Sequence, residues 1–162
     1  MEDDIMSVEN VKNYLKQYGL EGKVKEFETS SATVELAAQA AGVIPARIAK
    51  SLTFKIEDSA IMVVAAGDAK IDNHKYKEEF HTKAKMLTAE EVIAYTGHAI
   101  GGVCPFNLPQ DGIKVYLDVS LKRFDTVLPA AGSDSSCVVL TLEELEKASK
   151  FKKWIDVCKL PE

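Results

Sequence analysis

The sequence predicts one α+β domain with a mixed β-sheet, and three observations support this fold class. Its 162 residues are enough for one compact domain with a core and are few for two. The content of 46% hydrophobic and 28% charged residues is typical of a globular protein. Most of the expected strands follow one another too closely for an all-parallel sheet, because a parallel crossover needs about a dozen residues or more.

The first half of the chain alternates capped helical segments with short strands. Ser7 can begin a helix that Gly19 ends, and a second, alanine-rich helix can end at Gly42. Pro45 suits the first position of a short helix. The expected elements are, in order, a helix over about 7–18, a strand over 24–28, a helix over about 33–41, the short helix from 45, and a hairpin of strands 52–56 and 60–65 around a turn at 57–59.

The second half contains two capping boxes, which begin at Thr88 and at Thr141. Trp154 is expected to pack the C-terminal segment against the domain. The expected elements are a charged helix over 72–80, a strand or extended piece at 83–87, helices from 88 to 96 and from 141 to about 149, and strands at 114–118, 126–131 and 137–140, with a turn at 132–135.

Charge and cysteine usage limit the classes of protein that the chain can belong to. The net charge of −5 argues against broad non-specific binding of nucleic acid, so we expect no DNA partner. The chain has no apolar run of membrane-spanning length, and its start, at Met1, is acidic where a signal peptide is basic. Three cysteines without a CxxC pair fit a reducing compartment. We therefore expect a cytoplasmic domain without membrane contact.

Lys50 is the first candidate functional residue. It is expected where the short helix behind Pro45 runs into the strand that carries Leu52, Phe54 and Ile56. A lysine held still between rigid elements can meet a phosphate or a developing oxyanion. The alternative is a solvated lysine at the start of a strand, as most lysines are.

The second candidate is the run Gly-Gly-Val-Cys-Pro-Phe at residues 101–106, which we call the glycine segment. Two adjacent glycines let a ligand approach bare backbone amides, and Pro105 stiffens the exit. Such amides can bind a carbonyl or phosphate oxygen. The alternative is a tight turn with a structural role only.

Other chemistries find less support in the sequence. Cys104 follows His98 by six residues, which raises the alternative of a thiol nucleophile, but no third orienting group is evident. His74 and His81 stand in no recognised metal-ligand spacing, and no dinucleotide or Walker motif is present. We therefore expect no metal and no cofactor.

Taken together, these stretches resemble the YbaK/prolyl-tRNA-synthetase-associated editing domain family of freestanding aminoacyl-tRNA deacylases. The resemblance runs from about residue 27 to residue 145 of what we expect to be a single editing domain over 1–162. The segments that carry it are TVELAA (33–38), GVIPARIAKSL (42–52), AGD (66–68) with ID (71–72), TG (96–97), GGVCPF (101–106), LD (117–118) and AAG (130–132).

The resemblance implies a curved mixed sheet with surrounding helices. It also implies hydrolysis of the ester that joins a wrong amino acid to the 3′ end of a tRNA, typically tRNA for proline. The implied partners are the tRNA acceptor end and, as a further candidate, prolyl-tRNA synthetase. The chemistry would rest on the substrate's 2′-hydroxyl or on a bound water, with no protein nucleophile.

The resemblance also assigns roles to residues. Lys50 would hold the terminal adenosine, and the glycine segment would embrace the aminoacyl carbonyl, so Lys50, Gly101 and Gly102 are the expected catalytic residues. The expected substrate-binding residues are Val103, Cys104, Pro105, Phe106, Ala131, Gly132 and Ser133.

Three positions depart from the family pattern. Cys104 stands where many members carry serine, Ala130 where many carry a polar residue, and Asn107 where glycine is common. The departures leave open whether alanine, cysteine, serine or a small non-protein amino acid is removed. The alternative function is a non-catalytic module of the same fold that recruits a tRNA, a synthetase or an amino acid.

Overall fold

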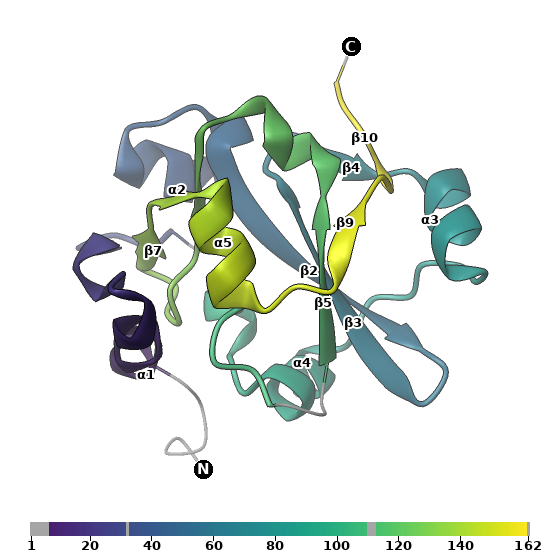
Figure 1. The fold of residues 1–162 in the computed structure, drawn as a ribbon, viewed down its shortest axis with the longest axis horizontal. Helices are drawn as coiled ribbons and strands as arrows, with labels where there is room; N and C mark the ends of the chain where they lie inside the picture. Colours follow the sequence, from purple (N-terminus) through teal and green to yellow (C-terminus); the bar gives the residue numbers. More distant parts are fainter. Residues whose placement is uncertain (1–6, 32, 110–112, 162) are drawn as a thin grey trace.

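The computed structural model describes residues 7–31, 33–109 and 113–161, and the acidic start predicted around Met1 lies outside them. Helices surround a curved sheet of six strands in the order β8-β6-β2-β3-β5-β9 (Figure 1). Strands β2 and β3 are antiparallel, whereas β2–β6, β3–β5 and β5–β9 are parallel. The predicted α+β class with a mixed sheet is confirmed.

The two longest strands form the predicted hairpin in the middle of the sheet. Strand β2 pairs with β3 over nearly its whole length, with a two-residue turn between Ile56 and Ser59. The strands of the large sheet are β2 (Ile48–Ile56), β3 (Ser59–Ala66), β5 (Ile113–Asp118), β6 (Thr126–Pro129), β8 (Leu140–Thr141) and β9 (Lys153–Ile155). Two smaller sheets pair β1 (Val24–Glu26) with β7 (Ser136–Val138) and β4 (Lys70–Ile71) with β10 (Cys158–Lys159).

The helices begin and end close to where the sequence predicts. Ser7, Thr88 and Thr141 each form a capping box, and Gly19 and Gly42 end their helices in the left-handed conformation. The helices are α1 (Val8–Leu15), α2 (Val34–Ala41), α3 (Asn73–Phe80), α4 (Ala89–Thr96) and α5 (Leu142–Ser149). Short 3₁₀ helices lie at η2 (Lys16–Tyr18), η3 (Glu21–Lys23), η4 (Pro45–Arg47), η5 (Ile100–Gly102) and η6 (Val119–Arg123).

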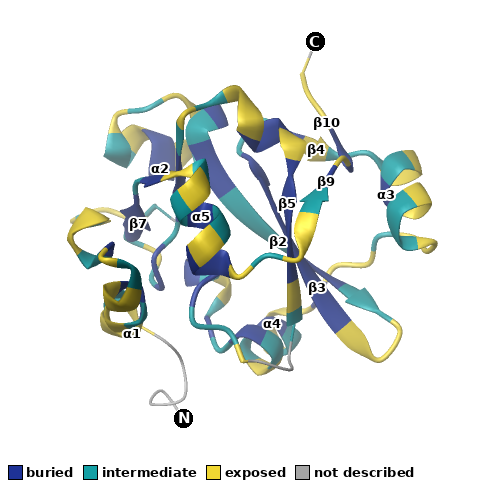
Figure 2. Ribbon diagram, viewed as in Figure 1, coloured by how far each residue is buried: buried dark blue, intermediate teal, exposed yellow. Residues whose placement is uncertain are grey.

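The core is built around β3, which is buried on both faces (Figure 2). Met62, Val63 and Val64 are fully inaccessible, as expected for a central strand without polar alternation. Aromatic side chains extend this core, since Tyr76 of α3 packs against Phe54 and Phe80. The sheet centre is therefore rigid, and the strands beside it can hold a site.

Several boundaries differ from the sequence prediction. Strand β2 begins at Ile48, so Lys50 lies within the strand and not at its junction with the helix. Residues 83–87 contribute only a bridge between Met86 and Phe54, and the strand expected over 137–140 is divided between β7 and β8. Tertiary pairing sets such short strands, and local periodicity does not report it. Within the described part of the chain, no helix is long and apolar enough to cross a membrane.

Candidate active site

The sheet opens beside Lys50 because the pairing between β2 and β6 is short. The two strands pair only at Ile48 with Leu128 and at Ala49 with Pro129. Proline has no backbone N–H, so Pro129 cannot continue a ladder of hydrogen bonds on that side. The main chain of β2 at Lys50 and Ser51 thus borders a gap in the sheet.

A cavity of about 130 Å³, which we call the Lys50 cavity, occupies this gap. Its walls come from α2, β2, β6, β7 and the glycine segment. The lining residues are Ser31, Thr33, Val34, Ala37, Ile48, Ala49, Lys50, Ser51, Ile100, Gly101, Val103, Leu128, Ala130, Ser136 and Cys137. The structure thus brings together two segments that the sequence separates by some fifty residues, Lys50 and the glycine segment.

Lys50 is held in place by backbone carbonyl groups. Its ammonium donates hydrogen bonds to the carbonyl oxygens of Gly67, at 3.3 Å, and Ala69. Burial lowers the pKa of the Lys50 ammonium, and the carboxylate of Asp68 is among the groups that oppose this shift. A lysine ammonium has three donors. Two are therefore used to fix its position, and one remains for a ligand.

The turn that supplies these carbonyls is itself braced. Asp68 forms a two-pronged ion pair with Arg123, with contacts of 2.6 and 3.1 Å, which lowers the pKa of the Asp68 carboxyl. Gly67 lies directly against the main chain of Pro45, where a β-carbon would collide with the carbonyl oxygen. The position of the Lys50 ammonium is thus set by groups on separate segments of the chain.

The glycine segment has two sides. Gly101 and Val103 are partly exposed and line the Lys50 cavity, whereas Gly102 and Cys104 between and beyond them are buried. Both glycines lie in the 3₁₀ helix η5, whose backbone does not require positive φ. The meeting of bare backbone with a ligand, expected from the sequence, thus remains a prediction, and Gly101 is the glycine that lines the cavity.

Gly102 fits closely against another part of the chain. A β-carbon added at Gly102 would lie 2.7 Å from the backbone nitrogen of Ser133 and 2.8 Å from the carbonyl carbon of Gly132. Gly132 has φ of +94° and is itself pressed against the backbone of Ser7 at the start of α1. Gly102 and Gly132 thus serve a close approach of main chains, and the catalytic role expected for Gly102 stays a prediction.

Cys104 and His98 are neighbours in the core and not in the cavity lining. The sulfur of Cys104 lies 3.6 Å from Nε2 of His98, and both side chains are inaccessible to solvent. Nε2 of His98 lies 2.9 Å from the carbonyl oxygen of Phe106, so this nitrogen carries the proton and donates it. Burial lowers the pKa of His98 and raises that of Cys104 to about 12. His98 and Cys104 therefore pack together in the core beneath the glycine segment, and the Cys104 thiol is neutral at neutral pH.

The remaining predicted binding residues do not line the Lys50 cavity directly. Phe106 and Ala131 are inaccessible, and Pro105 borders a different cavity. Ser133 contacts the Lys50 cavity indirectly, because its hydroxyl lies 2.8 Å from that of Ser136 in the lining. The substrate-binding roles of these residues, and of Cys104, remain predictions.

The cavity lining offers hydroxyl groups but no evident base to activate them. Among the described residues that border it there is no histidine or carboxylate. Cys137 is the one thiol in that described lining, and burial raises its pKa to about 11, so it is protonated at neutral pH. The described chain also gathers no group of three His, Cys, Asp or Glu side chains that could hold a metal ion.

Sequence reasoning missed Ser51, Ser136 and Ile100 as parts of this site. Ser51 Oγ is buried and has no hydrogen-bond partner in the described structure. Ile100 is 61% exposed at the cavity rim, although its size and apolar character favour burial. The only signal for these positions in the sequence is that Ser51 and Ile100 are neighbours of Lys50 and Gly101. Strands β2, β6 and β7 meet here through pairing between segments that are distant in the sequence.

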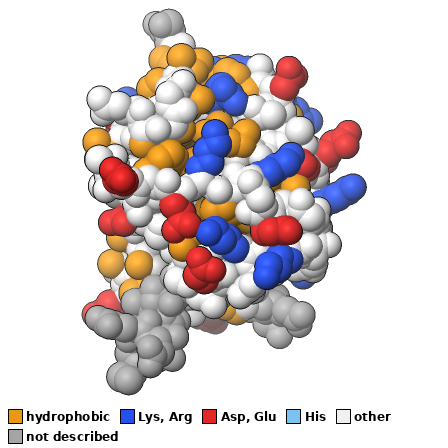
Figure 3. All heavy atoms as spheres, turned by 90° about the vertical axis from the view of Figure 1, so that its left-hand side faces the viewer, with side chains coloured by type: hydrophobic (Ala, Val, Ile, Leu, Met, Phe, Trp, Pro, Cys, Tyr) orange, Lys and Arg blue, Asp and Glu red, His pale blue; other side chains and the backbone are white. Residues whose placement is uncertain are grey.

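The outer surface near this region combines apolar and charged groups. On the face formed by α1, β7 and α2, lysine and arginine side chains alternate with acidic ones, with apolar side chains between them (Figure 3). Leu36 of α2 and Ile44 in the turn after it are 41% and 59% exposed.

Comparison with known proteins identifies the family of the chain. Residues 28–148 match the model of the aminoacyl-tRNA editing domain. The protein YwhH of Bacillus subtilis is 57% identical over 155 residues, which cover 95% of this chain and 98% of that protein. The proline–tRNA ligase of Bacillus subtilis is 32% identical over 67% of this chain, but the match spans only 18% of the ligase.

A solved structure shares the whole fold. It belongs to a protein described, as a provisional assignment, as a trans-editing enzyme for prolyl-tRNA synthetase. The two superpose with a TM-score of 0.83 at 30% identity, over 94% of this chain and 96% of the other. The chain belongs to the aminoacyl-tRNA editing domain family.

Proposed function

We propose that the chain removes a small, wrongly attached amino acid from tRNA for proline by hydrolysing the aminoacyl ester. One observation carries the proposal: Lys50, whose ammonium is fixed by two carbonyls, lines a cavity within the sheet together with Gly101. The family membership and the similarity to part of a proline–tRNA ligase support it. The chain on its own would then be a trans-editing enzyme.

The size of the Lys50 cavity favours a small amino acid. At about 130 Å³ it is below the roughly 300–1,000 Å³ of sites for larger ligands. An alanyl, seryl or cysteinyl side chain could enter, while the terminal adenosine would lie across the rim formed by Ile100. The free donor of Lys50 would then bind a phosphate or ribose oxygen of that adenosine.

In this proposal the protein positions the ester and the substrate or solvent supplies the nucleophile. A water oxygen forms the new bond to the acyl carbon, and the ribose 3′ oxygen leaves as a hydroxyl with the proton from that water. The 2′-hydroxyl of the substrate can orient the water. Gly101 lines the cavity, and in this proposal its main-chain amide stabilises the carbonyl oxygen.

Turnover on mischarged tRNA tests the proposal. We expect purified protein, at a concentration far below the substrate, to release amino acid from alanyl-, seryl- or cysteinyl-tRNA for proline and to spare prolyl-tRNA. Loss of many ester equivalents per protein would establish an enzyme. Protection of the ester from spontaneous hydrolysis would instead establish a binding module of the same fold.

A further inference from the structure

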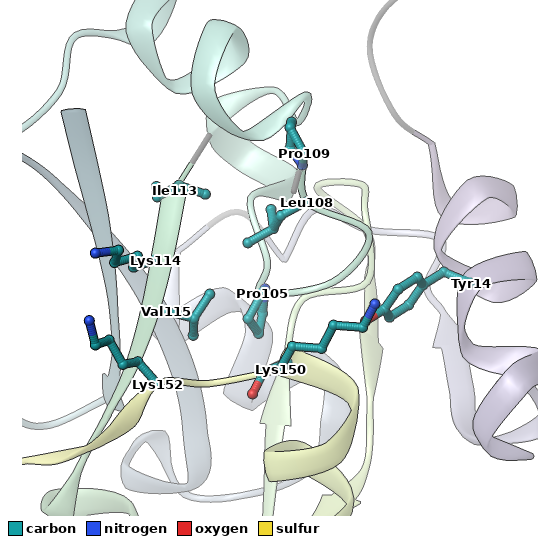
Figure 4. Close-up of a pocket in the computed structure, with 10 residues that line it drawn as sticks. Tyr14, Pro105, Leu108, Pro109, Ile113, Lys114, Val115, Lys150 and Lys152 are labelled. Carbon is teal, nitrogen blue, oxygen red and sulfur yellow. The ribbon is translucent and has the colours of Figure 1, made fainter. Parts of the chain in front are cut away.

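A second cavity, of about 310 Å³, borders the end of the glycine segment at Pro105 and the residues that follow it (Figure 4). Its floor is apolar, with Pro105, Leu108 and Val115. Its rim carries the three lysines Lys114, Lys150 and Lys152, and we call it the lysine cavity. These lysines are not among the site residues predicted from the sequence.

Two of these lysines lie side by side. The backbone N–H of Lys152 donates to the carbonyl oxygen of Val115, which places Lys152 beside Lys114. The pKa of Lys152 is lowered, chiefly by the neighbouring Lys114. No described carboxylate forms an ion pair with either one, although the next residue, Lys153, binds Glu79 at 2.8 Å. This local cluster of positive charge contrasts with the net charge of −5 of the whole chain.

Lys150 lies at the end of α5, and its side chain extends over the Tyr14 ring. Lys150 follows α5 with φ of +51°, a left-handed conformation that glycine adopts at lower cost. Its ammonium lies 5.8 Å from the centre of the Tyr14 ring, and the Tyr14 hydroxyl is anchored to the carbonyl of Ala148.

The arrangement of the charges fits a chain of phosphates better than a single small anion. Figure 4 shows the side chains of Lys114 and Lys152 extending together on one side of the cavity, while Lys150 extends toward Tyr14 on the opposite side. Cations on two separate sides can each meet one phosphate of a polynucleotide backbone. The apolar floor between them suits a ribose or base.

We propose that the lysine cavity binds consecutive backbone phosphates of the tRNA whose 3′ end enters the Lys50 cavity. This inference rests on the proposed function for its choice of RNA. The glycine segment links the sites, because Gly101 and Val103 line one cavity and Pro105 lines the other. Lys114, Lys150 and Lys152 would add affinity that is independent of the amino acid.

Binding of uncharged tRNA tests this inference without relying on turnover. The test variant is Lys114→Ser/Lys150→Gly/Lys152→Ser, in which the change at position 150 relieves the positive φ and so favours folding. The matched control for charge is a variant of three exposed lysines elsewhere, Lys70→Ser/Lys77→Ser/Lys83→Ser. Fluorescence anisotropy with labelled tRNA gives the affinity at a series of salt concentrations.

We expect the test variant to bind tRNA about tenfold more weakly near 0.1 M salt. The slope of log affinity against log salt should fall by about one unit for each phosphate that is no longer neutralised. The control variant should stay near wild type on both measures. Equal losses in test and control variants would reduce the effect to net charge and overturn the inference, as would an unchanged affinity in the test variant.

Two further arms separate the proposals and the sources of phosphate. On 3′-aminoacylated adenosine, which carries no backbone phosphate, the test variant should deacylate at the wild-type rate. If wild type deacylates nothing yet tRNA binding still depends on the three lysines, the proposed function fails and this site stands. Saturable binding of AMP or inorganic phosphate, lost in the test variant while tRNA binding persists, would identify a small-anion site and overturn the RNA assignment.

Discussion

Gly101 and Gly102 are identical neighbours that the fold uses in opposite ways. Gly101 lines the Lys50 cavity, whereas Gly102 is buried with its α-carbon against the backbone of Gly132 and Ser133. The same division continues at Val103 on the cavity side and Cys104 on the core side. The glycine segment thus has one side that lines the cavity and one side that packs in the core. Mutations on the two sides should have different consequences.

The largest effect on activity is expected from Lys50→Ala, on the cavity side. A charge-assisted hydrogen bond to substrate is worth about 1.5–3 kcal/mol, so the single-turnover deacylation rate should fall by roughly ten- to a hundredfold. The carbonyls of Gly67 and Ala69 lose their donor, so the melting temperature should also fall.

The matched control is Lys55→Ala on the same strand, where Lys55 forms a surface ion pair with Glu91 at 3.4 Å. Its rate should stay near wild type. A wild-type rate in folded Lys50→Ala would remove Lys50 from the mechanism.

A smaller effect, on stability, is expected from His98 on the core side. Burial lowers the pKa of His98 in the folded state, and its Nδ1 is buried without a partner in the described structure. The unfolded state therefore binds more protons once the pH falls below about 6.5, so this residue makes the protein less stable toward acid. The groups that face the imidazole are the Phe106 carbonyl and the Cys104 thiol, while the Thr96 hydroxyl accepts from the backbone N–H of His98.

His98→Gln removes the titration while its amide can still donate to the Phe106 carbonyl. Urea unfolding at pH 8 and pH 5 should therefore lose less stability on acidification in His98→Gln than in wild type. Parallel curves for the two proteins would mean that His98 is not kept neutral by the fold.

The smallest effect is expected from Cys104→Ser. The thiol is inaccessible, with a pKa raised to about 12, and it lies outside the lining of the Lys50 cavity. Replacement by a hydroxyl should cost about 1 kcal/mol of stability or less if the hydroxyl keeps a backbone partner. The preferred amino acid should not change. An acyl group trapped on Cys104, found by mass spectrometry of the quenched reaction, would establish thiol catalysis.

Local signals predicted most of the fold. Caps at Ser7, Thr88 and Thr141 and the apolar run of β3 placed the helices and the central strand correctly. The short strands β4, β9 and β10 escaped prediction because two or three residues carry no period and pair only through tertiary contacts.

The site was predictable only in part. Lys50 and Gly101 could be found because the residue types suggest chemistry and because the chain resembles an editing family. Ser51, Ser136 and Ile100 could not, because they lie on β2, β7 and η5, which come together at the cavity only through tertiary contacts. The sequence also contains no indication of which residues of the glycine segment face inward, since a 3₁₀ turn and an extended piece divide them.

The most direct test of this division is to compare Gly101→Ala with Gly102→Ala. For each variant, the melting temperature and the single-turnover rate on mischarged tRNA for proline are measured on the same preparation. We predict that Gly101→Ala keeps its melting temperature and loses turnover, because a methyl group intrudes on the Lys50 cavity. Gly102→Ala should instead lose about 1–3 kcal/mol of stability, because its β-carbon meets the Ser133 backbone at 2.7 Å, while its folded fraction turns over normally. Wild-type turnover in Gly101→Ala, together with a wild-type melting temperature in Gly102→Ala, would contradict the account.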